Sequence, residues 1–386
     1  MRPTMTDTCI TLQDRGLRIA IGETDAYFNY YWLRDACESC IDPQTKERVF
    51  DSSVLAQPPF AESAWVEDDA LRIHWRDEGF VSRVPMRLLR DMVELGHPHD
   101  PAALPRKLWY GDFQPRILRI GQDDVLHDDA ARARFCRALI EDGIAIVTGM
   151  DKDHGAMGRL VGAIGMITPS GEGLDFDVRV EIEPTNLAFT AGPLEMHTDL
   201  PGEEAAPGVQ FLHCLENTVD GGMSLFLDGA AVAEALRVED PDAFALLAHY
   251  EIPFFYRHTH LDYRAHQRVI ETDARGNVTG VTISQHLQDT IDLPQELLDT
   301  YYPAFVKFIR MMQEDRFRIR FRSEAGNCVV FDNHRIVHGR EGYVADSGMR
   351  HLRGCYTDRG ALHSTYRVLV RNGFDGLVAQ EVLQTA

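Results

Sequence analysis

Short segments of alternating apolar and polar residues, typical of antiparallel strands, fill most of the chain after Pro193. Only two segments there, residues 230–249 and 294–313, have the spacing of helices. A Rossmann-type sheet would alternate strand and helix throughout, so the pattern favours a mainly β sandwich or barrel backed by helices. The expected strands lie within residues 208–216, 222–229, 249–257, 268–283, 316–339 and 350–358.

The first hundred residues contain a weak internal repeat. Residues 17–37 and 71–92 each begin as an alternating strand, pass a turn rich in Gly, Asp or Glu, return as a second strand and end in Leu-Arg-Asp. Two such hairpins predict a small antiparallel β domain over residues 1–100. The proline-rich stretch that follows predicts a linker over residues 101–120, and a larger domain over residues 121–386 whose first segments are helical.

The composition limits the partners and the compartment. A formal charge of −21, from 39 Lys and Arg against 60 Asp and Glu, opposes binding to nucleic acid phosphates or to an anionic membrane surface. The chain has no apolar run of membrane-spanning length, and its first residues lack the apolar core of a signal peptide. Seven scattered cysteines suit a reducing compartment better than a disulfide framework, so a cytoplasmic protein is expected.

Two histidines and one aspartate are the candidate catalytic residues. His197 and Asp199 stand two apart after an apolar segment, and residues i and i+2 of a strand project from the same face. His338 ends a later expected strand, just before a glycine. If the two strands are neighbours, the three side chains form the facial triad of non-haem Fe(II) oxygenases, which leaves room for O2 and a chelating co-substrate. Each histidine alone could equally be a satisfied core or surface residue, because the chain has 16 of them.

Arg350, one expected strand after His338, strengthens the oxygenase interpretation. A 2-oxoglutarate chelated to iron by its keto-acid end needs a guanidinium at its far carboxylate, ideally with paired hydrogen bonds. Ser224 offers a hydroxyl to the same carboxylate, although an ordinary strand residue would look the same. A zinc hydrolase could use the same triad but needs no such arginine. A non-catalytic β-barrel binding module would not need His197 and Asp199 together.

Five motifs follow one another from the N-terminal domain to the last expected strand: YWLRDACESC, HTDLP, PGVQFLHCLENTVDGGMSLFLDG, FDNHRIVHGR and RHLRGCYTD. This ordered set resembles the γ-butyrobetaine hydroxylase group of the taurine-dioxygenase-like Fe(II)/2-oxoglutarate oxygenases. The resemblance implies a distorted double-stranded β-helix, or jelly-roll, as the catalytic domain. It implies His197, Asp199 and His338 as iron ligands, Arg350 on 2-oxoglutarate, O2 as co-substrate, and a homodimer.

The N-terminal domain departs from that family at its metal site. The resemblance implies a structural zinc held by three cysteines and one histidine, but only Cys37 and Cys40 occur here, as C-x-x-C. Gly79 occupies the position of the histidine, and the nearby His74 would still leave one ligand missing. Two buried thiols are therefore expected in place of a zinc site.

The substrate residues implied by the resemblance are partly kept. In that family a trimethylammonium group is bound in an aromatic cage, whose ring faces attract a cation that cannot hydrogen-bond. The matching positions are Phe176, Phe189 and Tyr356, with Glu172 where a further aromatic residue is usual. The two phenylalanines could equally be ordinary core residues.

The anionic end of the substrate site differs more. Asn186 keeps one family position, whereas Gln285 and Leu200 replace an asparagine and a tyrosine. This pattern suits a phosphonate, so the predicted activity is hydroxylation of 2-(trimethylamino)ethylphosphonate at the carbon next to phosphorus, a step of organophosphonate catabolism. Hydroxylation of γ-butyrobetaine to carnitine is the alternative. Further donors to a phosphonate could come from Arg257, His258 or His286.

Overall fold

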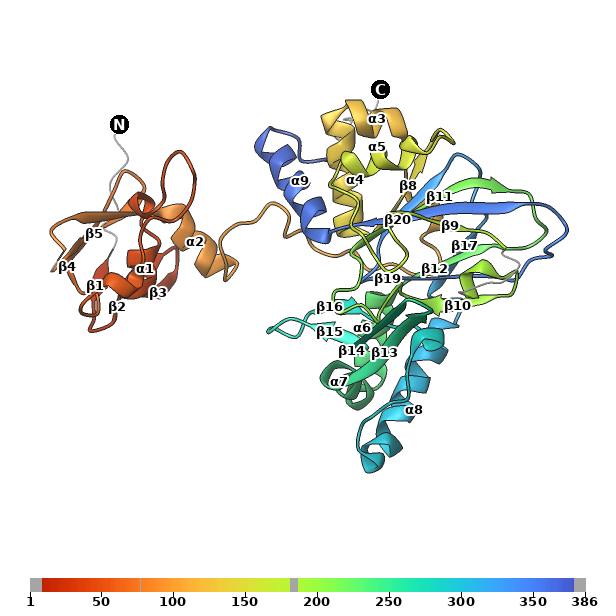
Figure 1. Cartoon of the computed structure of the whole chain (residues 1–386). Coiled ribbons are helices and arrows are strands. Elements are labelled where there is room, and N and C mark those ends of the chain that lie inside the picture. Colours follow the sequence, from red (N-terminus) through yellow and green to blue (C-terminus); the bar gives the residue numbers. More distant parts are fainter. Residues whose placement is uncertain (1–8, 77, 181–186, 378–386) are drawn as a thin grey trace, which may run out of the picture. The chain divides into compact units, whose positions relative to one another are not determined.

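The computed structural model describes residues 9–76, 78–180 and 187–377, and the chain divides into two compact units (Figure 1). The first unit ends at Asp100 and the second begins at Pro101. Each unit has a hydrophobic core of its own. In the described part of the chain, no helix is both long and apolar enough to cross a membrane.

Two small antiparallel sheets form the first unit, as the repeated hairpins predict. One has the order β1-β2-β3 and the other β4-β5-β6. Alternate residues of β2 and β5, such as Ile19 and Ile73, point into a shared core. Each repeat ends in a short helix. The elements are β1 (Ile10–Leu12), β2 (Gly16–Ile21), β3 (Thr24–Asn29), α1 (Tyr30–Asp35), β4 (Ala61–Glu67), β5 (Ala70–Trp75), β6 (Val81–Pro85) and α2 (Met86–Glu94).

A six-stranded sheet in the order β7-β8-β18-β11-β20-β9 is the larger of the two main sheets in the second unit. Helices α4, α5 and α9 cover one of its faces and share a core with β8, β11 and β18 (Figure 1). Helix α4 begins after Asp128, whose carboxylate caps two free N–H groups, and is followed by Gly143 at a φ of 79°. The elements are β7 (Leu118–Gly121), α3 (Gln122–His127), α4 (Asp129–Glu141), β8 (Ile144–Thr148), α5 (Gly155–Gly162), β9 (Phe176–Val178), β11 (Val209–Asn217), β18 (Cys328–Asp332), β20 (Arg350–Thr357) and α9 (Arg359–Arg371).

A four-stranded sheet in the order β10-β19-β12-β17 packs against the six-stranded one. Ile146, Phe226 and Phe331 belong to the buried cluster between the two sheets. Helices α6, α7 and α8 and the strands β13, β15 and β16 form a further core with the outer side of this sheet (Figure 1). The elements are β10 (Leu194–His197), β12 (Ser224–Asp228), α6 (Gly229–Glu239), α7 (Pro241–His249), β13 (Glu251–His258), β14 (Leu261–Arg268), β15 (Ile270–Thr272), β16 (Val278–Val281), α8 (Gln295–Met312), β17 (Arg318–Phe321) and β19 (Ile336–Arg340).

Residues 101–120, expected as a linker, lie in the second unit. Trp109 is 2% exposed and stacks on Phe113, with 5.0 Å between the ring centroids. Both rings belong to the cluster between the sheets, and β7 pairs in parallel with β8. The segment is therefore anchored, because its few apolar side chains complete a core.

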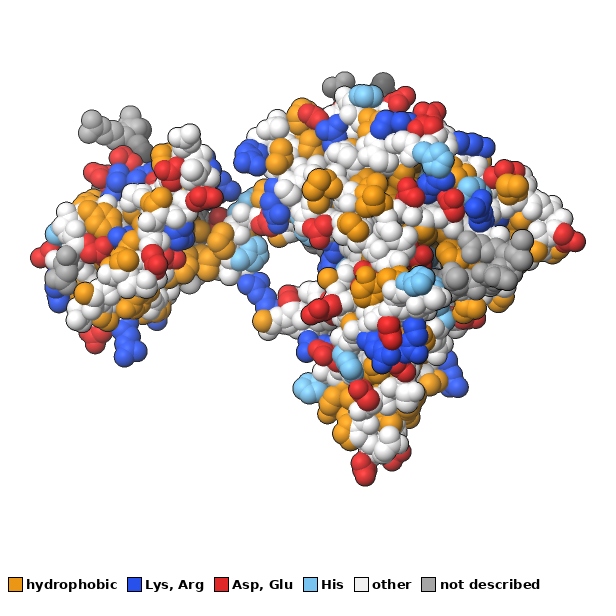
Figure 2. Space-filling model, viewed as in Figure 1, with side chains coloured by type: hydrophobic (Ala, Val, Ile, Leu, Met, Phe, Trp, Pro, Cys, Tyr) orange, Lys and Arg blue, Asp and Glu red, His pale blue; other side chains and the backbone are white. Residues whose placement is uncertain are grey.

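Charged side chains of both signs are interspersed over the face seen in Figure 2. Many of the cations are paired with carboxylates, for example Arg316 with Glu239 at 2.9 Å. Together with the net charge of −21, this surface offers no excess of cations to a phosphate backbone.

Candidate active site

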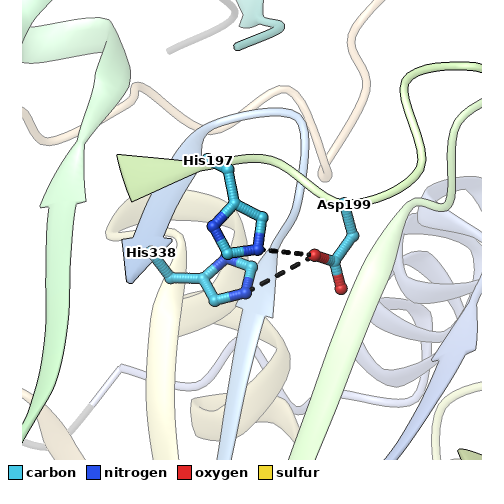
Figure 3. A group of neighbouring side chains, drawn as sticks. All are labelled: His197, Asp199 and His338. Carbon is cyan, nitrogen blue, oxygen red and sulfur yellow. Dashed lines mark ion pairs between the residues drawn. The ribbon is translucent and has the colours of Figure 1, made fainter. Parts of the chain in front are cut away.

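The two candidate histidines lie opposite each other on neighbouring strands. β10 ends at His197 and runs antiparallel to β19, where His338 is its register partner. One oxygen of Asp199 faces both imidazoles (Figure 3), and this Oδ1 atom lies 3.1 Å from His197 Nε2 and 3.6 Å from His338 Nε2. Possible ligand atoms of the three residues all lie within 4.8 Å of one another. The structure thus brings the predicted triad together.

The protonation states of these side chains suit a metal ion. His197 Nδ1 lies 2.8 Å from the Glu195 carbonyl oxygen, which can only accept, so Nδ1 donates this hydrogen bond and Nε2 is the nitrogen that faces Asp199. Burial, with repulsion from His197, lowers the pKa of His338 to about 3, so this imidazole is neutral. Burial alone would raise the pKa of Asp199, but the two imidazoles and a tyrosine hydroxyl hold that pKa well below its usual range. A neutral His338 and an ionised Asp199 are the forms that bind metals, and two imidazoles with one carboxylate are a donor set that fits non-haem iron.

The triad opens into a cavity of about 840 Å³, including its mouth. Apolar residues from both main sheets line it, among them Leu212, Phe226, Val329 and Leu352. Such walls exclude bulk water and strengthen the electrostatic interactions of the few polar groups inside.

Arg350, at the start of β20, lines the same cavity. Its side chain is buried, and its Nε and Nη1 atoms have no hydrogen-bond partner among the described residues. Burial and the neighbouring Arg340 lower its pKa to about 10, so the guanidinium remains charged at neutral pH. A buried cation that pairs with no carboxylate of the described residues calls for an anionic ligand.

Ser224 and Arg340 are register partners on β12 and β19, and both line the cavity. The Ser224 hydroxyl lies 2.9 Å from the Ser323 hydroxyl. The Arg340 guanidinium, at the end of the FDNHRIVHGR motif, donates to the carbonyl oxygens of Ala188, Thr190 and Gly192. Arg340 therefore fixes a loop of the cavity wall, and Arg350 is the arginine placed to receive an anion.

The predicted cage residues gather around this cavity. The rings of Phe176 and Tyr356 are tilted against each other with their centroids 5.5 Å apart. Phe189 and Leu200 are buried, Glu172 is half-buried, and all of these side chains line the cavity.

Tyr256, on β13, is a site residue that sequence reasoning does not single out. Its hydroxyl donates a short hydrogen bond to Glu172 Oε1. Burial and the Glu172 carboxylate raise the pKa of Tyr256 well above its usual value, so the hydroxyl keeps its proton and can go on donating. Tyr256 thereby fixes the Glu172 carboxylate at the cavity wall. Alternation along β13 marks Tyr256 as a core residue, but only the fold reveals its partner.

The predicted anionic end differs from expectation at Gln285. This residue lies on a short 3-10 helix, Gln285–Leu287, where its side chain is exposed and outside the cavity lining. The next two residues, His286 and Leu287, line the cavity instead, and the His286 ring centroid lies 5.0 Å from that of His197. Gln285 is assigned from its family position alone, and a 3-10 helix turns each successive side chain by a third of a turn, so the neighbouring residues face the cavity in its place.

Of the further donors considered, only His286 reaches the cavity. Arg257 is exposed and lies 3.5 Å from Asp262 in an ion pair. His258 packs its ring against Tyr256 and is not part of the cavity lining. Asn186 lies outside the described residues.

Cys37 and Cys40 are buried in the first unit. Arg34 Nη1 donates to Cys40 Sγ at 3.0 Å, and the Cys37 thiol lies 3.1 Å from the Ser39 hydroxyl. His74 pairs with a glutamate on the neighbouring strand. Within the described ranges, the triad of the second unit is the one group of three or more His, Cys, Asp or Glu side chains placed to hold a metal.

Arg34 is the centre of this part of the first unit. Its Nε and Nη2 atoms donate to the Glu78 carboxylate at 2.8 to 3.0 Å. Its guanidinium lies between two aromatic rings, 3.7 Å from the centroid of Phe50 and 4.4 Å from that of Phe80. One buried cation thus ties α1 to two loops and to Cys40.

We expect Arg34→Ala to lower the free energy of unfolding of the first unit by about 3 kcal/mol, because it leaves the largely buried Glu78 carboxylate unpaired. Arg18→Ala is the matched control, since the exposed Arg18–Asp25 ion pair should contribute less than about 1 kcal/mol. Hydrogen exchange across residues 9–100 of the full-length protein measures both effects. Equal effects of the two substitutions would show that the Arg34 cluster stabilises the unit no more than a surface pair does.

The chain is similar in sequence to a family model and to several known dioxygenases. The chain matches the family model described as "Taurine catabolism dioxygenase TauD, TfdA family" over residues 109–356. It is 35% identical over 355 residues to the gamma-butyrobetaine dioxygenase of Pseudomonas sp. (strain AK-1), covering 89% of this chain and 91% of that protein. It is 29% identical over 368 residues to the gamma-butyrobetaine dioxygenase of Homo sapiens, covering 91% and 94%. It is 24% identical over 365 residues to the mitochondrial trimethyllysine dioxygenase of Gallus gallus, covering 92% and 86%.

Proposed function

Because this chain belongs to the TauD/TfdA family of Fe(II)- and 2-oxoglutarate-dependent dioxygenases, we propose that it hydroxylates a small trimethylammonium acid, with γ-butyrobetaine as the first candidate. One observation carries the proposal: the triad, the buried Arg350 and the aromatic wall with Glu172 all line a single cavity. The named activity of the relative from Pseudomonas, over nearly the full length of both chains, favours γ-butyrobetaine. A zinc hydrolase, which the triad alone would allow, does not agree with the family, because the family uses iron and 2-oxoglutarate.

His197, Asp199 and His338 are the proposed iron ligands. Arg350 is the proposed partner of the far carboxylate of 2-oxoglutarate, with a further hydrogen bond from Ser224, which lines the same cavity. When bound, the iron and 2-oxoglutarate supply the O2-dependent oxidation of a C–H bond of the substrate. The task of the protein is to bind and orient the reactants and to keep bulk water out of the cavity.

Phe176, Phe189 and Tyr356 are the proposed walls of a cation site. Ring faces attract a quaternary ammonium group, which has no hydrogen to donate. Glu172, held by Tyr256, adds a negative charge at the same cavity. A trimethylammonium group therefore fits this wall better than a neutral group of the same shape.

A phosphonate at the other end of the substrate is the second candidate. The half-buried His286 supports it by offering the cavity a donor, but Gln285 and Arg257 lie outside the lining and give no support. Kinetics with γ-butyrobetaine and 2-(trimethylamino)ethylphosphonate, measured side by side, would decide. We expect the higher kcat/KM for γ-butyrobetaine, and a clearly higher value for the phosphonate would reverse the assignment.

We also propose the fold of the second unit, the oligomeric state, the compartment and the zinc content of the protein. The two facing sheets of the second unit support a distorted double-stranded β-helix, and the resemblance to the family favours a homodimer. The seven scattered cysteines favour a reducing compartment such as the cytoplasm. The donation from Arg34 to Cys40 Sγ supports a first unit without zinc. Metal analysis and light scattering of the purified protein would test the zinc content and the dimer.

Glu172→Gln is expected to weaken binding of the trimethylammonium substrate about tenfold, because it removes a charge near the cation inside an apolar cavity. Binding of a neutral tert-butyl analogue should change little. Glu203→Gln is the matched control, since Glu203 accepts from the Gly171 N–H beside Glu172 but lines a different cavity. An equal loss for both analogues, or an equal effect of the control, would contradict a cation site at Glu172.

A further inference from the structure

The second oxygen of Asp199 is held by two buried donors. Gln210 Nε2 donates to Asp199 Oδ2 at 2.6 Å, and the Tyr356 hydroxyl donates to the same atom at 2.7 Å. Gln210 is 1% exposed and Tyr356 is 2% exposed, so water does not readily replace either donor. The Oδ1 atom of Asp199 is left to face the two imidazoles (Figure 3).

The sheet determines the positions of these donors. Gln210 and Tyr356 are register partners on the adjacent strands β11 and β20, so both side chains leave the sheet on the face that lines the cavity. The amide of Gln210 must present its nitrogen, because its oxygen would repel the carboxylate. Tyr356 therefore has two contacts: its ring packs against Phe176, and its hydroxyl binds Asp199.

The backbone of Asp199 is fixed as well. The Asn333 side chain accepts from the Asp199 N–H at 2.8 Å and donates to the Asp199 carbonyl oxygen at 3.1 Å. Leu200, the next residue, has a φ of 51°, a left-handed conformation that is unfavourable for leucine and is kept only where the surroundings impose it. With its backbone and Oδ2 both fixed, the Asp199 carboxylate cannot turn freely toward the imidazoles.

We propose that Gln210 and Tyr356 are positioning residues that restrict Asp199 to one metal-binding oxygen. The inference rests on the proposed iron site. A carboxylate that binds with both oxygens occupies one more coordination position, whereas a triad with one atom from each residue leaves the opposite face open for a chelating keto acid and O2. The two donors thus keep room for 2-oxoglutarate.

The double variant Gln210→Met, Tyr356→Phe tests this, because it keeps the side-chain volumes and the ring but removes both donors. The double variant Gln122→Met, Tyr366→Phe is the matched control, since Gln122 and Tyr366 are equally buried donors to backbone carbonyl oxygens elsewhere in the unit. Binding of Mn(II) alone is followed by electron paramagnetic resonance. Binding of 2-oxoglutarate to protein saturated with Fe(II) is followed anaerobically by the visible absorption of the chelate.

We expect the test variant to bind Mn(II) about as well as the control variant does. It should bind 2-oxoglutarate about tenfold more weakly than the control variant, or more weakly still, because two hydrogen bonds to a charged carboxylate are lost. The single variants should lie between the double variant and the wild type. Unchanged binding of 2-oxoglutarate, or loss of Mn(II) binding itself, would overturn the proposal. A wild-type protein that binds iron but never forms the chelate would instead overturn the proposed function, and this inference with it.

Discussion

Arg350→Ala should raise the concentration of 2-oxoglutarate needed for binding by about 30-fold to several thousand-fold, corresponding to about 2 to 5 kcal/mol. The guanidinium is buried and charged, and its Nε and Nη1 atoms find no partner among the residues that the structure describes. Removing it leaves the far carboxylate of the co-substrate without a counter-charge in an apolar cavity. The affinity for the metal alone should not change, because Arg350 lies outside the triad. Titration of Fe(II)-loaded protein with 2-oxoglutarate measures the affinity for the co-substrate.

Two neighbouring arginines provide comparison variants for this experiment. Arg353 lies on the same strand but binds Asp177 at 2.9 Å and is not part of the cavity lining, so Arg353→Ala should leave 2-oxoglutarate binding unchanged. Arg340 lines the cavity but donates to backbone carbonyl oxygens, so its loss should disturb the wall without removing the counter-charge. If Arg340→Ala weakens 2-oxoglutarate binding more than Arg350→Ala does, the far carboxylate is held by Arg340.

His197→Ala should abolish the visible absorption of the anaerobic Fe(II)–2-oxoglutarate complex. Loss of one of the three ligands should lower the metal affinity by about 100-fold. This figure takes the contribution of one ligand as roughly a quarter of the binding free energy of a protein metal site that has four ligands. His286→Ala is the control, since the His286 ring lies 5.0 Å from that of His197 and lines the same cavity but is not in the triad. The absorption should survive in the control. Its persistence in His197→Ala, or an equal loss in both variants, would contradict the assignment of the ligands.

Part of the site can be predicted from the sequence, because His197, Asp199 and the later histidine before Gly339 point to a triad before any coordinates are known. The strand positions expected for two of them differ in the structure, since Asp199 lies beyond the end of β10 and His338 is the middle residue of β19. What alternation cannot tell is which strands are neighbours and in which register. The contact of Tyr356 and Gln210 with Asp199 depends on the pairing of β20 with β11, which is fixed only by the whole sheet.

Other features fall outside strand alternation altogether. Gln285 lies on a 3-10 helix, so its neighbour His286 faces the cavity in its place. Trp109 lies in a proline-rich segment without periodicity, and yet its burial anchors that segment in the second unit. Arg34 gains its partners from loops distant in sequence, and no local pattern marks a cation that binds a thiol and a carboxylate together.

We propose that this dioxygenase acts on a trimethylammonium acid, and the release of succinate by the wild-type protein with Fe(II), 2-oxoglutarate and O2 tests this proposal. The substrates to compare are γ-butyrobetaine, 2-(trimethylamino)ethylphosphonate and the tert-butyl analogue of each. We predict that succinate forms in step with a hydroxylated product from at least one of the trimethylammonium acids, and far more slowly with the neutral analogues. If no trimethylammonium acid accelerates succinate release, although iron and 2-oxoglutarate are bound, the claim is wrong.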